Sequence, residues 1–338
     1  MTSVKKNLTT FGYVTINNVH PFSKGNNGFQ ISPKLQEHMV YAAQGDSYEN
    51  CNEVLAQFIN IKISAAQVWR VAMVYAEEVG KTIAEERILP PCSKNDTVYA
   101  MVDGSMLFTR EDGWKEVKLG RIFKSSDCVH ADGKQGWIKR SQYLAYLDTH
   151  KKFTAEAEKI LDDYREQKQP LVFISDGAAW IKNWIDDAYP EAISVLDFYH
   201  ASEYLHEFAR TEFGNEVQRK QWTEEKLKLL SEGKVQQIIA ELKEPPNLSK
   251  AAEKLIDYYE SNKMRMNYPL YKTIGAGIIG SGAIESAHRT VIQKRMKQSG
   301  QRWSRQGAQN MLHLRVTKKN GQWSKIIELT KQNFKSAA

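Results

Sequence analysis

The sequence predicts an α/β protein, built on a mixed sheet with flanking helices. Between residues 96 and 127 the chain takes on β character, with turn signals at 103–104 and 111–113, which predicts an antiparallel meander. Helical and strand patterns then alternate up to residue 200, as they do where helices cover a sheet. Residues 201–272 show almost only helical periodicity. An all-helical insertion is therefore expected to interrupt the sheet.

The first thirty residues predict an N-terminal arm. Glycines and asparagines surround a short β-like stretch from Tyr13 to Ile16, as in a small hairpin followed by a loose connection. Residues 31–94 predict a helical region. Its clearest helix runs from Ser47 to Ile59, where apolar residues fall at helical spacing.

A second helix of this region is expected between Ser64 and Gly80. Ser64 and Gln67 form a capping box, and the glycine suits a C-terminal stop. Two amphipathic helices joined by a short turn match a helix-turn-helix, with Gln67, Arg70 and Tyr75 as candidate contacts in the major groove. A plain helical hairpin remains the alternative.

The core that holds the sheet is expected over residues 95–200 and 275–300, on either side of an insertion at 201–274. The expected strands lie at 98–102, 105–108, 114–123, 171–174 and 192–196. The expected helices lie at 143–167, directly after Asp176-Gly177, and from about residue 283 into a basic C-terminal tail at 301–338.

Composition limits the classes of protein that this sequence fits. Hydrophobic residues make up 41% and charged residues 26%, and no apolar run approaches the roughly 18 residues that cross a bilayer. The start of the chain lacks the pattern of a signal peptide, and three scattered cysteines offer neither a disulfide framework nor a CxxC zinc pair. The expected location is the cytoplasm.

Positive charge is concentrated near the C-terminal end. Residues 286–338 hold twelve Lys or Arg and one acid, a balance of +11, against thirty-five bases and thirty-nine acids elsewhere. Clustered Lys and Arg neutralise phosphates and so give general affinity for nucleic acid. The expected partner is a polyanion, and a basic face exposed to solvent without a partner is the alternative.

Two aspartates follow predicted strands and precede a glycine. Asp103 comes after residues 99–102, and Asp176 comes after residues 171–175. Glycine lets the backbone turn away, which would leave each carboxylate at the rim of the sheet. Two-metal phosphoryl transfer needs hard oxygen ligands of this kind. An ordinary strand-Asp-Gly turn explains either residue taken alone.

A third acid, Glu285, lies in the first turn of a predicted helix among small residues. Its charge suits the helix N-terminus, which alone explains its position. Basic residues continue along the same helix and beyond it, where they would follow a phosphate backbone. They are Arg289, Lys294, Arg295, Lys297 and Arg302. A carboxylate followed by bases suits a nuclease.

Several segments in order resemble bacterial insertion-sequence transposases of the DDE type, close to the ISKra and ISLre groups and related to Mutator elements. They are MVDGSM, GWKEVKLGRIF, VFISDGAAWI, AISVLDFYHASEYL, NKMRMNY, GIIGSGAIESAHRTVIQKRMKQSGQRW and GAQNMLHLR. The resemblance implies a ribonuclease H-like core in which Asp103, Asp176 and Glu285 form the metal-binding catalytic triad. The intervals of 73 and 109 residues between them are consistent with such a core.

The resemblance also implies cofactors and partners. Two Mg²⁺ or Mn²⁺ ions would serve metal-activated cleavage at the ends of a transposon, followed by strand transfer into target DNA. The protein would act at the nucleoid as a homodimer or larger synaptic complex. Asp197 and His200 match an Asp-x-x-His segment that implies support of the active site. A structural role is favoured for Glu203 and His206, which continue the three-residue spacing.

Other patterns favour structural roles. Residues 275–280 match GxGxxG, but they follow a helical region without the βαβ unit of a dinucleotide site. Trp303 would either stack on an unpaired base or anchor the core. Two rival functions remain open: a nuclease with the same core that does not join strands, and a DNA-binding protein that has lost catalysis.

Overall fold

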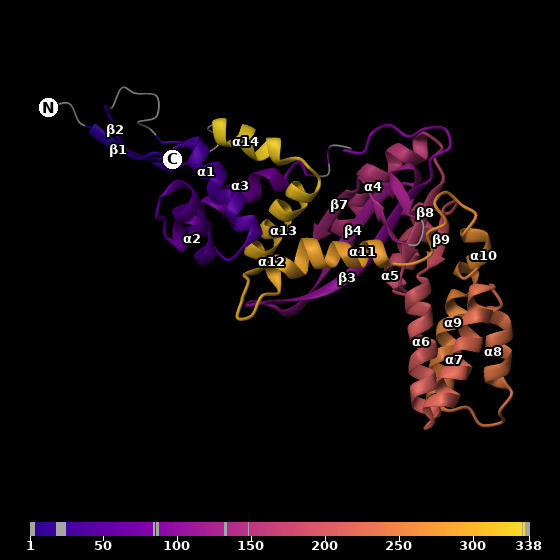
Figure 1. Ribbon diagram of the computed structural model, residues 1–338. Helices are drawn as coiled ribbons and strands as arrows, with labels where there is room; N and C mark the ends of the chain where they lie inside the picture. Colours follow the sequence, from indigo (N-terminus) through magenta and orange to yellow (C-terminus); the bar gives the residue numbers. More distant parts are fainter. Residues whose placement is uncertain are drawn as a thin grey trace.

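The computed structural model describes residues 4–17, 25–83, 85, 88–131, 134–147, 149–332 and 334. The remaining residues of the predicted arm and of the predicted basic tail lie outside this description. Figure 1 shows a central sheet with helices at both ends of the molecule. Within the described residues, no helix combines the length and apolar character needed to cross a membrane.

The centre of the fold is a five-stranded mixed sheet, as the sequence predicts. Its strands are β3 (Val98–Thr109), β4 (Gly113–Lys124), β7 (Gln142–Tyr146), β8 (Leu171–Ser175) and β9 (Ile193–Leu196), in the order β7-β4-β3-β8-β9. β4 pairs antiparallel with both β3 and β7, and β8 and β9 extend the sheet in parallel from β3. β8 is buried along its whole length, as expected of a parallel strand covered on both faces.

Two neighbouring residues of β4, Gly120 and Arg121, show which helices cover the two faces of the sheet. The backbone of Gly120 lies against the ring of Phe153 from α4 (His150–Glu166), and a Cβ at Gly120 would come within 3.0 Å of it. Arg121 points to the opposite face. There its Nη1 donates to the carbonyl of Ala283 in α11 (Gly282–Ala287) at 2.6 Å. Helix α5 (Ala179–Ala188) joins the α4 face, where Trp184 packs edge-on against Phe173.

Three predicted features of the sheet region and of the helix that follows it are wrong, and one hairpin is present that the sequence did not predict. β3 continues through Asp103-Gly104 instead of turning, because β4 pairs with it as far as Thr109. Residues 143–146 belong to β7 rather than to a helix, since a short apolar run fits a buried strand equally well. A hairpin of β5 (Cys128–Ala131) and β6 (Lys134–Ile138) is additional. The long helix expected from residue 283 becomes π-helical over η4 (His288–Gln293) and ends after α12 (Lys294–Met296).

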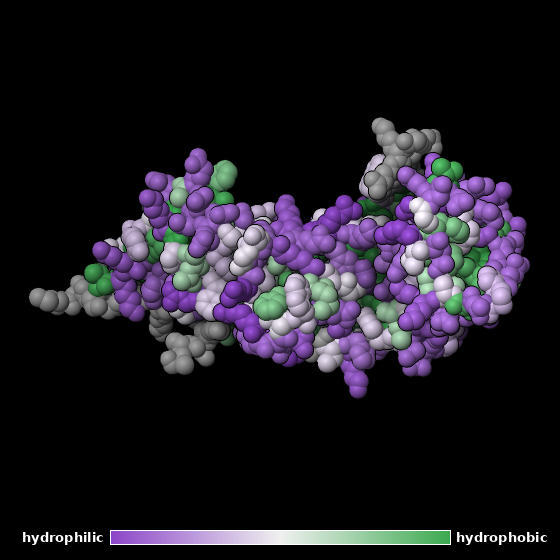
Figure 2. Space-filling view, turned by 90° about the horizontal axis from the view of Figure 1, so that it is seen from below, coloured by the Kyte–Doolittle hydropathy of each residue, from purple (hydrophilic) through white to green (hydrophobic). Residues whose placement is uncertain are grey.

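The helical character predicted for residues 201–272 is confirmed, but these helices follow the last strand of the sheet instead of interrupting it. They are α6 (Phe198–Glu212), α7 (Glu216–Ser231), α8 (Val235–Lys243) and α9 (Lys250–Asn262), followed by η3 (Lys263–Arg265) and α10 (Tyr268–Tyr271). These helices project from one end of the sheet (Figure 1). Figure 2 shows a mainly hydrophilic surface, with hydrophobic residues visible within the end that the insertion forms.

The N-terminal helices pack with the C-terminal helices around a second core. These are α1 (Pro33–Gly45), α2 (Tyr48–Ile59), α3 (Ala65–Gly80), α13 (Arg305–Lys319) and α14 (Trp323–Lys331), beside a hairpin of β1 (Val4–Thr9) and β2 (Gly12–Asn17). Ser47 and Ser64 cap α2 and α3, as predicted. Tyr75 is fully buried, and its hydroxyl donates to Gln36, so it is not exposed for a DNA contact.

His313 in α13 contacts α3 within this second core. We expect its burial to make the protein less stable in acid. Nδ1 lies 3.2 Å from the carbonyl of Ala76, and Nε2 lies 2.8 Å from Nε2 of Gln309, an arrangement that suits a neutral ring. Burial lowers the pKa of His313 to about 4. Since the folded protein holds this ring neutral, stability should fall as the pH drops from about 6.5 towards 4, by at most about 3 kcal/mol. Urea unfolding at several pH values measures this loss, and His313→Gln should remove part of it; an unchanged pH profile in the variant would contradict the assignment.

Candidate functional site

Two carboxylates meet where the parallel part of the sheet ends. Val102 of β3 pairs with Ser175 of β8, so Asp103 and Asp176 are the next residues along two adjacent strands. Oδ1 of Asp103 accepts from the backbone N–H of Gly104 at 2.7 Å, and Oδ1 of Asp176 accepts from that of Ala178 at 3.0 Å. Both side chains are partly exposed. The structure thus places the two acids on adjacent strands, although Asp103 is within a strand rather than at its end as predicted.

The electrostatic surroundings of Asp176 disfavour its negative charge. Burial raises the pKa of this carboxyl above its ordinary value, and the charge of Asp103 adds to the rise. The backbone N–H of Ala178 and the charges of His200 and Arg265 act in the opposite direction. The guanidinium of Arg265 is buried, and its Nη2 donates to Oγ of Ser175 at 2.7 Å.

His288 approaches Asp103 from the helix that crosses this face of the sheet. Its Nε2 lies 3.0 Å from Oδ2 of Asp103. This is an electrostatic contact, because neither ring nitrogen makes a well-directed hydrogen bond to any part of the chain that the structure describes. The imidazole is buried all the same. Sequence reasoning missed both His288 and Arg265, and the position of His288 one helical turn after Glu285 was the available signal.

Glu285 reaches this region through the same helix. It lies on the exposed part of α11, and its Oε1 accepts from the hydroxyl of Ser281 at 2.9 Å. His288, three residues further on, contacts Asp103. The helix that carries Glu285 therefore lies over β3, the strand that carries Asp103.

The fully buried side chain of Asp197 connects α6 to the segment before α11. It caps α6, and its Oδ1 also accepts from the backbone N–H of Ser281 at 2.8 Å. His200, one turn into α6, lies between Asp197 and Glu203, with contacts of 3.7 Å and 3.2 Å to their carboxylates. The backbone N–H of Asp197 donates to the carbonyl of Ser175 at 2.9 Å, next to Asp176, and His200 opposes the rise in the pKa of Asp176.

The donor atoms suit a divalent cation at the Asp103 and Asp176 carboxylates. Both supply hard oxygen, and a cation would relieve the repulsion that helps to raise the pKa of Asp176. The buried ring nitrogens of His288, which have no hydrogen-bond partner among the described residues, also lie next to Asp103. Over the described residues, no three His, Cys, Asp or Glu side chains gather closely enough to hold a metal ion as a group.

The predicted DNA-binding side chains have different surroundings. Arg70, Arg289, Lys294, Lys297 and Arg302 are exposed, whereas Arg295 is buried. The guanidinium of Arg295 donates through Nε to the carbonyl of Ala43 and lies over the rings of Tyr48 and Trp303, 5.0 and 5.1 Å from their centroids. Arg295 and Arg302 line a cavity of about 590 Å³ at the N-termini of α2 and α3. Arg295 therefore contributes to packing, and only part of the local positive charge is exposed.

The remaining motifs have structural explanations. Gly275 and Gly277 have φ angles of +56° and +67°, and a Cβ at Gly275 would come within 2.9 Å of the Tyr99 hydroxyl, so this turn needs glycine for close packing. Trp303 is buried, and its Nε1 donates to the carbonyl of Met296 at 3.0 Å. Of its two interpretations, the core anchor is the one consistent with this burial.

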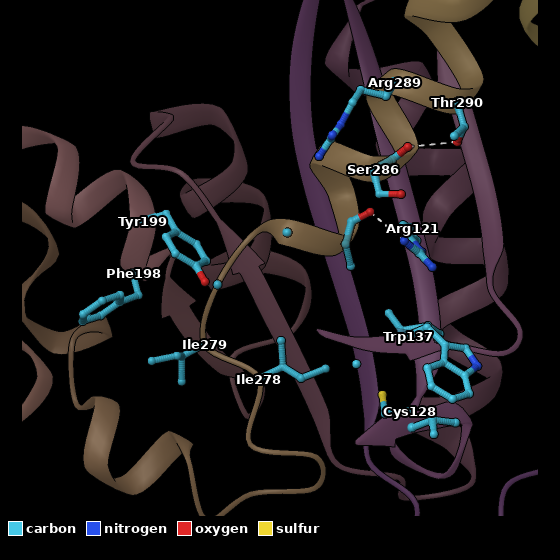
Figure 3. A pocket seen from close by; sticks show the side chains of 16 residues that line it. Arg121, Cys128, Trp137, Phe198, Tyr199, Ile278, Ile279, Ser286, Arg289 and Thr290 are labelled. Carbon is cyan, nitrogen blue, oxygen red and sulfur yellow. Dashed lines mark hydrogen bonds between the residues drawn. The ribbon is translucent and has the colours of Figure 1, made fainter. Parts of the chain in front are cut away.

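A larger cavity of about 900 Å³ lies between α11 and the β5–β6 hairpin (Figure 3). Fold and site together define a mixed α/β protein with paired aspartates on adjacent parallel strands and a helix carrying a third acid across them. The chain belongs to the uncharacterised protein family UPF0236, whose family model matches residues 24–333.

Two curated relatives carry the same family name. A UPF0236 protein in the vanSb 3' region of Streptococcus gallolyticus is 23% identical over 307 residues, which cover 86% of this chain and 64% of the relative. A UPF0236 protein of Caldanaerobacter subterraneus subsp. tengcongensis, whose name joins eleven locus designations, is 26% identical over 211 residues, which cover 59% of this chain and 43% of the relative. The chain thus spans less than two thirds of either relative.

The family assignment corrects the resemblance drawn from the sequence motifs. The matching family is UPF0236, which is distinct from Mutator, so assignment to the DDE insertion-sequence families of the ISKra, ISLre and Mutator type is wrong. Short motifs around acids and glycines recur on unrelated chains, whereas the family model spans most of this one.

Proposed function

We propose that this chain cleaves DNA and joins the cut strand to a second DNA, the reaction of a transposase. The observation that carries the proposal is the pair Asp103 and Asp176 on adjacent parallel strands, with the pKa of Asp176 raised by burial and by the charge of Asp103. Paired carboxylates of this kind are suited to divalent cations and phosphoryl transfer.

The strand order supports a ribonuclease H-like interpretation of the core. Three antiparallel strands extended by two parallel strands form the arrangement expected of such a sheet, and the acids fall on its two central neighbours, β3 and β8. Glu285 comes from a helix across the same sheet, after the helical insertion. The predicted triad is thus drawn from three parts of one core.

In the proposed mechanism, the carboxylates of Asp103 and Asp176 would hold Mg²⁺ or Mn²⁺, and Glu285 would complete the site. Bound metal supplies charge neutralisation at the phosphate and a nucleophilic oxygen. His288 fixes the orientation of the Asp103 carboxylate, and Arg265 holds the end of β8 through Ser175. Exposed Arg289 and Lys294 on the same helical segment would contact DNA phosphates.

The name of the Caldanaerobacter relative gives independent support. It joins eleven locus designations of one strain. Repeated copies of one protein are the expected product of an element that inserts copies of itself. The proposal extends this property to the present chain, together with location at the nucleoid and assembly as a homodimer or larger complex on two DNA ends.

The test of this proposal is cutting and joining of labelled DNA that carries the sequences flanking the gene. In Mg²⁺ or Mn²⁺ the protein should release a labelled strand and transfer it to a second, unlabelled DNA. Cutting without transfer would identify the nuclease alternative. DNA binding without cutting in either metal would contradict catalysis and support the DNA-binding alternative.

His288→Ala should reduce the apparent affinity for Mn²⁺, or the cleavage rate, by about 10- to 100-fold, because side chains that orient a metal ligand have effects of this size. The reason is the 3.0 Å contact that holds the Asp103 carboxylate. Titration of Mn²⁺ against the cleavage rate measures the effect. His206→Ala, on the exposed side of α6, is the control; equal rates for the two variants would contradict the positioning role.

A further inference from the structure

The cavity of about 900 Å³ has walls from three parts of the chain. One wall is the β5–β6 hairpin, a second is the exposed side of α11 and η4, and the third joins residues 278–280 to the start of α6. In Figure 3, Trp137 lies on one side of the cavity and Tyr199 on the other, with Ser286 and Arg289 on the helix above them. Ser286 and Arg289 belong to the same helical segment, α11 and η4, as Glu285 and His288.

Aromatic side chains are exposed on opposite walls. Trp137 is 56% exposed and Tyr199 is 58% exposed, although both are large and apolar. The ring of Tyr199 lies over the backbone of Gly280, so closely that a Cβ there would come within 2.5 Å of the ring. Exposed aromatic faces held in a concave site are typical binding surfaces for planar ligands.

The charged side chains that line the cavity are arginines. Arg289 is exposed and makes no ion pair with any described residue. Arg121 is buried at the base of α11, where it is held by the Ala283 carbonyl and by Oγ of Ser141, at 2.6 and 2.9 Å. No Asp or Glu is among the described side chains that line this cavity. A ligand with an anionic group and a planar ring matches both properties.

The size of the cavity distinguishes between forms of DNA. A volume of about 900 Å³ lies within the range of roughly 300–1,000 Å³ that small-molecule sites have, so the cavity is suited to one or two nucleotides rather than to a duplex. Bases stack on aromatic rings largely without regard to sequence, and a base that is already unpaired avoids the cost of leaving the double helix.

We propose that this cavity binds an unpaired nucleotide of the DNA strand next to the cleavage site, with its base against Trp137 or Tyr199 and its phosphate near Arg289. The inference rests on the proposed function for the identity of the ligand. It adds a specificity: the chain favours DNA ends whose terminal bases are unpaired or easily opened.

The experiment compares the affinity of three fluorescein-labelled DNAs in EDTA by anisotropy: a paired duplex, the same duplex with a two-nucleotide single-stranded extension, and a single strand. Wild type should bind the extended duplex more tightly than the paired one. Trp137→Ala should lose about tenfold in affinity for the extended duplex and less than about twofold for the paired duplex. Trp137→Phe should restore the preference.

Trp114→Ala is the matched control, because Trp114 is 65% exposed at the far end of β4 and outside this cavity. An equal preference of wild type and Trp137→Ala for the extended duplex would overturn the inference, as would an equal loss in Trp114→Ala. Because the assay needs no metal, its result is independent of catalysis. Wild type that cuts and joins DNA but binds the extended and the paired duplex equally well would refute the inference about the cavity and leave the proposed function intact.

Discussion

Asp103→Asn and Asp176→Asn should each lower metal-dependent cleavage by about a thousandfold while leaving DNA binding in EDTA within about twofold of wild type. Metal ions contribute several kcal/mol to transition-state stabilisation, and each 1.4 kcal/mol is tenfold in rate. The amide retains the shape of the carboxylate but removes its charge. Rates of strand release in Mg²⁺ measure the loss, and Asp187→Asn, an exposed position on α5, is the control.

Asp176→Asn should also raise the melting temperature in the absence of metal. The folded protein raises the pKa of this carboxyl, so the group favours folding when it is protonated, and this contribution is lost as the pH rises through the folded pKa. At neutral pH the amide removes that destabilising charge. A variant that is inactive and less stable than wild type would indicate a structural role for Asp176 rather than a metal site.

Arg315→Ala should destabilise the fold by about 3 kcal/mol or more. The guanidinium is buried between α13, α1 and η4, and it donates to the carbonyls of Gln44, Thr290 and Val291. Burial lowers the pKa of Arg315 to about 10. Truncation leaves several buried carbonyls without donors, each at a cost of about 1–3 kcal/mol.

Urea unfolding followed by circular dichroism measures the change. Arg305→Ala, on the exposed start of the same helix, should cost less than about 1 kcal/mol. Similar losses in the two variants would contradict the assignment of Arg315 to the interface between the N-terminal and C-terminal helices.

The sequence predicts the elements of this fold better than their connections. Periodicity and capping identify α2 and α3, and Ser47 and Ser64 cap them as expected. The strand through Asp103 is longer than predicted, because pairing with β4 outweighs the local turn tendency of Asp-Gly. The apolar run of β7 was ambiguous, since burial on a sheet and burial in a helix select the same side chains.

The candidate site is only partly readable from the sequence. Asp103 and Asp176 stand out because each follows an apolar strand. His288 and Arg265 do not, since their roles depend on helices that return to the sheet from distant parts of the chain. Counting charges in the sequence also overestimates the exposed basic surface, because the guanidinium groups of Arg295 and Arg315 are buried and donate to backbone carbonyls. Composition carries no information about which bases are buried.

Every step of the proposed reaction depends on joint binding of metal by Asp103 and Asp176. The most direct measurement is an anomalous-difference map from crystals of the protein soaked in Mn²⁺. The account predicts a peak between the two carboxylates, within the roughly 2–2.5 Å ligand distances of hard cations, and its loss in Asp176→Asn. A map without a peak at these residues, or with manganese bound only elsewhere, would contradict the account.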